Sequence, residues 1–182
     1  MVALLLMAGL GVSPHHAEPV DAFGYGLRVT ARTAFLFFML AYLARPVREL
    51  TGGSTWLVRH RRYLGLAMAV AHTVHFGYIV LYFRAVGELP DAITIVFGGG
   101  AFVVMWLMAL TSNDASVRRL GARWRRLHRG GMHYLWFIFA YTWLGVALVD
   151  PWYWGFVAVA LIGFAVRIAA QVARRRSATA QT

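Results

Sequence analysis

Long apolar segments alternate along this chain with short polar connections. Five of the segments reach or approach the roughly 20 residues that a helix needs to cross about 30 Å of hydrocarbon. A chain inside a membrane must satisfy its own backbone hydrogen bonds, so each segment is predicted to be a helix. The five predicted spans cover residues 27–44, 63–83, 92–111, 132–149 and 152–172.

Proline, aspartate and glycine mark several features of these predicted spans. Pro46 follows the first span and is expected to end its helix. Asp150 and Pro151 supply an N-cap and a first-turn proline for the last span. The three glycines at 98–100 are expected to allow close packing or a bend in the third span.

The N-terminal apolar stretch, residues 1–12, covers only about 18 Å as a helix and cannot span a membrane unaided. A signal peptide would need a basic region before it and a clear small-residue cleavage site after it, which are not evident. We therefore expect a short first transmembrane helix, giving an all-α bundle of six with both termini cytoplasmic. The predicted divisions are 1–25 (first helix and periplasmic loop), 26–173 (transmembrane domain) and 174–182 (basic cytoplasmic tail).

The composition supports a membrane bundle and excludes several kinds of chemistry. The chain is 60% hydrophobic with a mean hydropathy of +0.60, too apolar for an ordinary soluble domain. It has no cysteine, which excludes disulfides, thiolate metal sites and cysteine nucleophiles. No predicted span carries Asp or Glu near its middle, which argues against a proton or cation transporter and a carboxylate-bridged di-iron centre. Intramembrane chemistry is left to histidine.

The positive charge predicts an orientation in the membrane and not binding to nucleic acid. All eighteen basic residues are arginine, and the net charge is +11. Fifteen of them fall on alternate connections or near the C-terminus: Arg45, Arg48, Arg59, Arg61, Arg62, Arg118, Arg119, Arg123, Arg125, Arg126, Arg129, Arg167, Arg174, Arg175 and Arg176. Five of the seven acidic residues lie on the other connections. The arginine-rich side is therefore predicted to be cytoplasmic.

Four histidines lie in or near two of the predicted helices. His72 and His75 are three residues apart, which places them on one face of the second span, roughly 15 and 20 Å from its cytoplasmic edge. On the helix that contains the fourth predicted span, His128 lies near the cytoplasmic surface of the membrane. His133 lies roughly 10 Å from that surface, inside the membrane. A neutral imidazole carries a donor and an acceptor, and leaving them unsatisfied in hydrocarbon is costly.

Two explanations account for these imidazoles. Each one alone can be a structural residue bonded to a carbonyl or hydroxyl, with Thr73, Thr142 and Tyr78 as candidate partners. Four on two helices favour a haem between the helices, because iron satisfies one ring nitrogen while a protein acceptor holds the other. A small metal site is a further alternative. Gly130 and Gly131 would admit a macrocycle or serve helix packing.

Three stretches, 30–48, 61–76 and 109–136, resemble the ferric-reductase-like transmembrane family, in particular the haem-binding subunits of bacterial periplasmic methionine sulfoxide reductase systems. The most specific parts are RR-x-LGL with a histidine fourteen residues after its first position, and LG-x-RW-x-x-LH. The resemblance covers about residues 26–172. It implies a six-helix domain that holds one or two b-type haems.

Carried over by position, the family's cofactor-binding residues fall on His75, His128 and Arg61. The family's second histidine on the later helix corresponds here to Tyr141, so one expected imidazole is missing. Tyrosine can ligate haem iron but seldom supports low-spin electron transfer. His72 or His133 is therefore expected to fill the vacancy, and the identity of the ligand pair stays open.

The resemblance implies a b-type cytochrome of a bacterial inner membrane that acts as an electron-transfer subunit. The chain has no G-x-G-x-x-G fingerprint and no soluble domain large enough for flavin or NAD. Its electrons are expected from a separate flavin reductase or quinol, with FMN or a quinone as a further candidate cofactor. A periplasmic reductase, ferric iron or a quinone would accept them. The alternatives are a ferric reductase membrane component, a transporter for a metal or haem, and a haem-free structural or scaffold protein.

Overall fold

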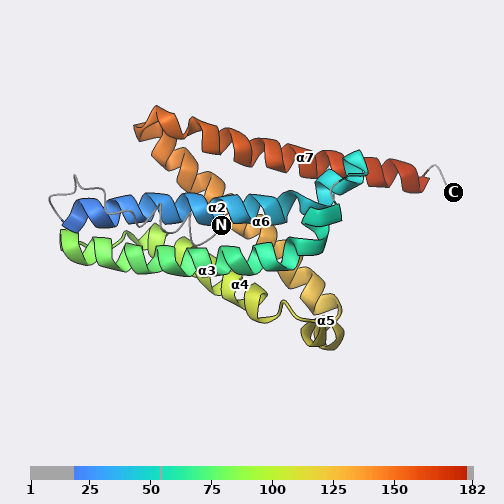
Figure 1. The fold of residues 1–182 in the computed structure, drawn as a ribbon, viewed down its shortest axis with the longest axis horizontal. Helices are drawn as coiled ribbons and strands as arrows, with labels where there is room; N and C mark the ends of the chain where they lie inside the picture. Colours follow the sequence, from blue (N-terminus) through green and yellow to red (C-terminus); the bar gives the residue numbers. More distant parts are fainter. Residues whose placement is uncertain (1–18, 54, 180–182) are drawn as a thin grey trace.

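The computed structural model describes residues 19–53 and 55–179 and shows a bundle of long helices (Figure 1). In chain order the elements are α2 (Pro19–Thr51), α3 (Thr55–Val86), the π-helical turn η1 (Thr94–Gly98), α4 (Gly99–Leu110), α5 (Asp114–Leu120), α6 (Ala122–Val149), the 3-10 turn η2 (Pro151–Tyr153) and α7 (Trp154–Thr179). No strand occurs in this part of the chain. The prediction of an all-α bundle is confirmed.

Four helical runs are long and apolar enough to cross a membrane: α2, α3, α6 and the continuous run of η2 and α7. The third predicted span, 92–111, is helical over residues 92–110. The run from Thr94 to Leu110 passes the same test only together with α5, which is bent from it by 102°. The short first helix predicted for residues 1–12 lies outside the described residues.

Helix α2 is the centre of the bundle. It runs antiparallel to α3, α7 lies along another side of it, and α6 crosses the α2–α3 pair obliquely (Figure 1). In its most apolar window α2 is 56% buried, against 28% or less for the other three long helices. Phe35 and Phe38 of α2 pack on Phe139 of α6 with ring centroids 5.4 and 5.1 Å apart. Large aromatic rings therefore fill the space between the crossing helices.

Pro46 does not end the first span as predicted, because it lies inside α2. Proline has no N–H, so the carbonyl of Tyr42, four residues earlier, lacks its helical donor. Arg167 of α7 donates to that carbonyl at 3.4 Å, and its guanidinium lies 4.5 Å from the centre of the Tyr42 ring. Arg61 of α3 donates to the preceding carbonyl, that of Ala41, at 3.1 Å. Side chains from neighbouring helices thus stabilise the turn that contains the proline.

The predicted start of the last helix is confirmed. The Asp150 carboxylate accepts a hydrogen bond from the Trp152 backbone N–H at 3.0 Å, and Pro151 occupies the first position of η2. This turn leads directly into α7. It therefore reverses the chain between α6 and α7 within a few residues.

Gly100 provides the close packing that was one of the two expectations for residues 98–100. A Cβ on Gly100 would lie 2.9 Å from the hydroxyl of Tyr134 on α6. That hydroxyl donates to the carbonyl of Phe97, inside the π-helical turn, at 3.0 Å. A small residue is therefore needed where α6 supplies a hydrogen bond to the irregular start of α4.

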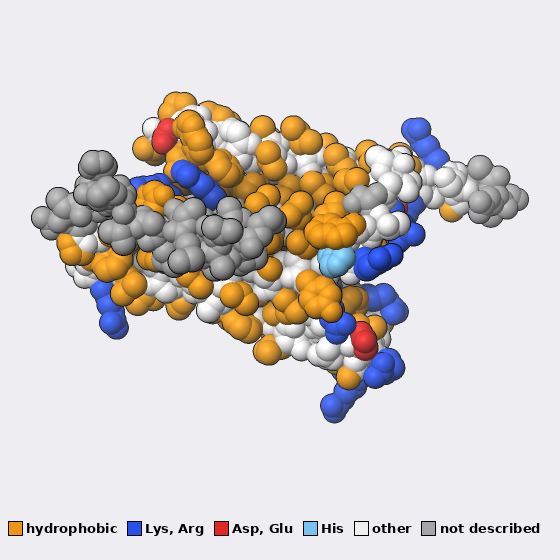
Figure 2. Space-filling view, in the orientation of Figure 1, with side chains coloured by type: hydrophobic (Ala, Val, Ile, Leu, Met, Phe, Trp, Pro, Cys, Tyr) orange, Lys and Arg blue, Asp and Glu red, His pale blue; other side chains and the backbone are white. Residues whose placement is uncertain are grey.

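The arginines of alternate connections gather at one end of the bundle. This end holds the C-terminal ends of α2 and α7 and the N-terminal ends of α3 and α6 (Figures 1 and 2). We call it the arginine-rich end. At the opposite end, Arg32 of α2 donates to the Tyr153 hydroxyl at 2.9 Å and lies 4.8 Å from the centre of the Trp152 ring. This arginine is thus accommodated by aromatic side chains rather than by an acid.

We predict that Arg167→Met lowers the free energy of unfolding by about 1–3 kcal/mol, the range for losing a hydrogen bond from a charged donor. In a Pro46→Ala background the new N–H of residue 46 can bond the Tyr42 carbonyl, so the same change is expected to cost less. Unfolding of the four proteins in detergent with increasing SDS gives the coupling. Equal costs in both backgrounds would show that Arg167 does not act through this carbonyl.

Candidate functional site

The His75 imidazole of α3 is held by a hydroxyl group on α2. Its Nδ1 lies 3.0 Å from Thr30 Oγ1, and the Thr30 hydroxyl donates its single hydrogen to the Gly26 carbonyl at 2.7 Å. The Thr30 oxygen therefore accepts a hydrogen bond from Nδ1–H of His75, which fixes the proton on that nitrogen. The Nε2 atom of the neutral ring keeps its lone pair for another ligand.

His72 lies beside His75 on the same face of α3, as their spacing predicts. The two ring centroids are 5.2 Å apart with an interplanar angle of 35°. The Nδ1 atom of His72 is buried and has no hydrogen-bond partner among the described residues. A further residue that would hold the same group together with one of these rings is therefore expected on another helix.

The contact between α2 and α3 depends on Gly26. A Cβ at this position would collide with the ring of Tyr78 on α3. The absence of a side chain lets the two helices approach closely one turn before Thr30. This places the Thr30 hydroxyl within hydrogen-bond distance of His75.

Sequence reasoning missed Thr30 as the partner of His75. Thr73, one of the predicted partners, donates to the Ala69 carbonyl of its own helix at 2.7 Å. Thr30 is a hydroxyl residue within the apolar span predicted for residues 27–44, and this is the only signal the sequence carries. Its pairing depends on the register of α2 against α3.

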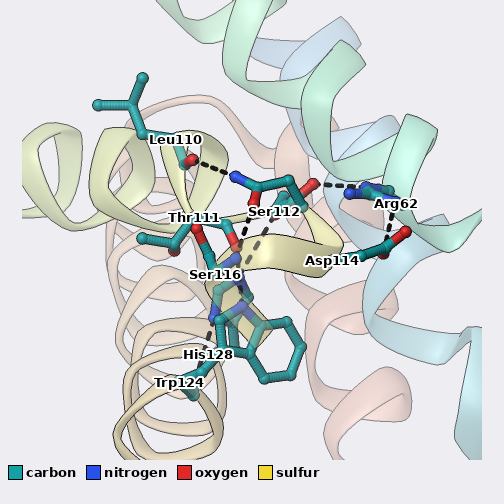
Figure 3. Close-up of polar contacts among 9 residues, drawn as sticks. Arg62, Leu110, Thr111, Ser112, Asp114, Ser116, Trp124 and His128 are labelled. Atoms are coloured by element: carbon teal, nitrogen blue, oxygen red, sulfur yellow. Dashed lines mark hydrogen bonds and ion pairs between the residues drawn. The ribbon is translucent and has the colours of Figure 1, made fainter. Parts of the chain in front are cut away.

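His128 joins α6 to α4 at the arginine-rich end (Figure 3). Its Nδ1 lies 3.2 Å from the Trp124 carbonyl, and its Nε2 lies 3.2 Å from the Met108 carbonyl and 3.4 Å from the Ser112 hydroxyl. The imidazole also stacks on the Trp124 ring at 4.0 Å. Both ring nitrogens therefore have protein partners, and neither is left for a metal ion in this arrangement.

The chain around His128 is fixed to α3 as well. Arg62 donates to the Ser112 carbonyl and to the Asp114 carboxylate, the latter at 3.1 Å (Figure 3). The Trp124 indole donates to the Thr111 carbonyl at 2.9 Å. The connection between α4 and α5 is thus bonded to both α3 and α6.

The structure does not bring the α6 histidines to the α3 pair. His133 lies edge-on to the Tyr42 ring at 6.2 Å. From Tyr42 the aromatic rings continue through Phe38 and Phe139 to His72, with centroid separations of 5.3, 5.1 and 5.9 Å. Aromatic side chains thus occupy the space between the two candidate ligand sets.

Two other candidate residues also lie apart from His75. Tyr141 is 54% exposed, and its ring stacks on Phe137 at 6.3 Å on the outer surface of α6. Arg61 donates to the Ala41 carbonyl of α2, as described above.

Gly131 packs against α4, because a Cβ there would collide with Met108. Helix packing is therefore its role in this structure.

No family model matches the chain, and no solved structure matches it. Among curated proteins, it is 34% identical to the protein-methionine-sulfoxide reductase heme-binding subunit MsrQ of Azospira oryzae, over 90% of this chain and 73% of the relative. The chain belongs to the MsrQ family. MsrQ of Ralstonia nicotianae is also 34% identical, over 75% of this chain and 68% of the relative.

MsrQ of Deinococcus radiodurans gives a similar result, with 34% identity over 72% of this chain and 67% of the relative. Membership of the MsrQ family confirms the resemblance drawn from the sequence motifs. The ligand assignments at His72, His75, His128, His133 and Tyr141 stay predictions, as does the cofactor role of Arg61.

We predict that His128→Phe keeps the stacking on Trp124 but loses the hydrogen bonds to α4. This should lower the free energy of unfolding by about 1–3 kcal/mol. His60→Phe is the matched control, because the His60 ring bonds only the Trp56 carbonyl of its own helix among the described residues. Thermal unfolding of both variants in detergent gives the comparison, and equal shifts would contradict an interhelical role for His128.

Proposed function

We propose that this MsrQ-family protein is the haem-binding membrane subunit of a periplasmic methionine sulfoxide reductase system and carries electrons across a bacterial inner membrane. The observation that supports this most is the His75 imidazole, whose Nδ1–H is held by Thr30 while Nε2 keeps its lone pair. A histidine that ligates a metal almost always donates its other N–H to a protein acceptor. The residues present therefore fit an iron ligand at His75.

His75 would hold the iron of a b-type haem through Nε2, and Thr30 would keep the ring in the required tautomer and orientation. Haem supplies a one-electron carrier when bound. His72, with its unpartnered buried nitrogen, is the second candidate on α3. On α6, His133 is a better candidate than His128 to hold a haem, because it makes no hydrogen bond among the described residues, whereas both ring nitrogens of His128 have protein partners. One haem or two, and FMN or a quinone on the donor side, stay predictions.

The charge distribution supports an outward direction of electron flow. The positive-inside rule places the arginine-rich end in the cytoplasm, where a flavin reductase or quinol would donate electrons. Helix α3 ends at the opposite, periplasmic end of the bundle. His75 lies eleven residues before its last residue, which is about 16 Å along the helix. Packed aromatic rings continue from Phe35 through Trp143 and Tyr153 to the exposed Trp152 at the same end. The periplasmic reductase would accept electrons there.

We predict that protein purified after expression with ample haem shows a sharp Soret band and the dithionite-reducible α and β bands of low-spin haem b. His75→Ala should lose most of the haem, measured as haem per protein. His60→Ala removes a partly exposed imidazole near the arginine-rich end and should keep the haem. A colourless wild-type preparation would instead support a haem-free scaffold, and unchanged haem in His75→Ala would move the assignment to His72.

The hydroxyl of Thr30 gives a second test of the same site. Thr30→Val removes the acceptor for Nδ1–H at nearly constant volume and is expected to weaken haem binding about 10–100-fold, the usual effect of losing a metal ligand's hydrogen-bond partner. Thr30→Ser keeps the oxygen and should bind haem nearly as the wild type does. Haem titration of the three apoproteins checks this. Equal affinities would show that Thr30 does not position the ligand.

A further inference from the structure

Two arginines from different helices converge on one turn of α2 near the arginine-rich end. Arg61 of α3 and Arg167 of α7 donate to the consecutive carbonyls of Ala41 and Tyr42. Both arginines are partly buried, and Arg167 lies over the Tyr42 ring. Both guanidinium groups therefore reach the same turn of α2, which brings two positive charges together. We call these two arginines and Tyr42 the arginine pair site.

No acidic side chain neutralises this site among the described residues. The ion pairs in this part of the chain are Arg45–Glu49, Arg174–Glu49 and Arg62–Asp114. Arg61 and Arg167 belong to none of them. Partly buried like charges are unfavourable unless an anion compensates them. The site thus lacks a negative partner.

The same site holds a further unused donor. The Tyr42 side chain is fully buried, and its hydroxyl has no hydrogen-bond partner among the described residues. Buried hydroxyl groups in proteins are normally bonded. An oxyanion bound by the arginines would supply both negative charge and additional acceptor atoms to this region.

The arginine pair site lies at a different depth of the bundle from the α3 histidines. Arg61 precedes His72 by eleven residues, which is about 16 Å along the helix. The cofactor role of Arg61 stays a prediction, and the test below distinguishes a haem carboxylate from another anion.

We propose that Arg61 and Arg167 bind the phosphate group of an anionic phospholipid in the cytoplasmic leaflet, which rests on the orientation proposed above. Guanidinium groups match phosphate oxygens in a bidentate geometry. Basic pockets between transmembrane helices on the cytoplasmic side bind anionic headgroups. The exposed apolar residues Leu161 and Ile162 precede Arg167 on α7, on the side of the bilayer centre, and offer contacts for acyl chains.

The test uses the full chain in detergent and measures retained lipid by native mass spectrometry, with phosphatidylglycerol and phosphatidylcholine as the probes. The variants are Arg61→Gln, Arg167→Gln and the charge-preserving Arg167→Lys. Arg126→Gln is the matched control, because Arg126 is an exposed arginine at the same end of the bundle. Melting temperatures without lipid identify any loss of folding, and Arg61→Gln stands as an independent variant if Arg167→Gln is unstable.

We expect wild-type protein to retain phosphatidylglycerol over phosphatidylcholine. Either glutamine variant should bind it at least about tenfold more weakly, and Arg167→Lys should fall between them and the wild type. Arg126→Gln should bind as the wild type does. An equal loss in Arg126→Gln would overturn the proposal, because it would show only general attraction between charges.

Two further arms distinguish other sources of the anion. Inorganic phosphate alone could raise the melting temperature of the wild type, with the same dependence on Arg61 and Arg167. That result would keep the phosphate chemistry but overturn the lipid source. Haem content is measured in parallel for every variant. Loss of haem with unchanged lipid binding would identify a haem carboxylate as the ligand and overturn the proposal. Lipid selectivity in haem-free protein supports it whatever the outcome for haem.

Discussion

The bundle depends on polar side chains that form hydrogen bonds between helices in apolar surroundings. Thr30 links the Gly26 carbonyl of α2 to His75 of α3, and Arg167 supplies the donor that Pro46 removes from the Tyr42 carbonyl. In hydrocarbon, an unsatisfied backbone or imidazole group costs several kcal/mol, because no water replaces the lost partner. These bonds therefore fix which faces of the helices meet, and the apolar packing follows that register.

This constraint also separates two kinds of histidine in one chain. His128 bonds the Trp124 carbonyl of its own helix through Nδ1 and the Met108 carbonyl of α4 through Nε2, so its polar groups are satisfied by the protein itself. His75 uses one nitrogen for its contact with Thr30 and keeps the other for a ligand. The MsrQ relatives are named for binding haem, and His75 is the residue whose local bonding suits that chemistry best. The partly buried arginines at the other end of the bundle suit an anion instead.

Much of the fold could be predicted from the sequence because hydrophobicity and helix caps are local properties. The long spans, the N-cap at Asp150 and the shared face of His72 and His75 all follow from residue type and spacing. The helical continuation through Pro46 did not follow, because it depends on donors from α3 and α7. The partner of His75 was missed for the same reason, since contacts between helices depend on a register that one sequence does not reveal.

The most direct measurement of the central claim is an experimental density map of the pigmented protein in a lipid nanodisc. The account predicts iron-porphyrin density joined to Nε2 of His75, with Thr30 Oγ1 within hydrogen-bond distance of Nδ1. Iron on a different residue, with His75 free, would contradict the ligand assignment. Side chains and lipid alone around His72 and His75 in haem-loaded protein would contradict the haem-binding function itself.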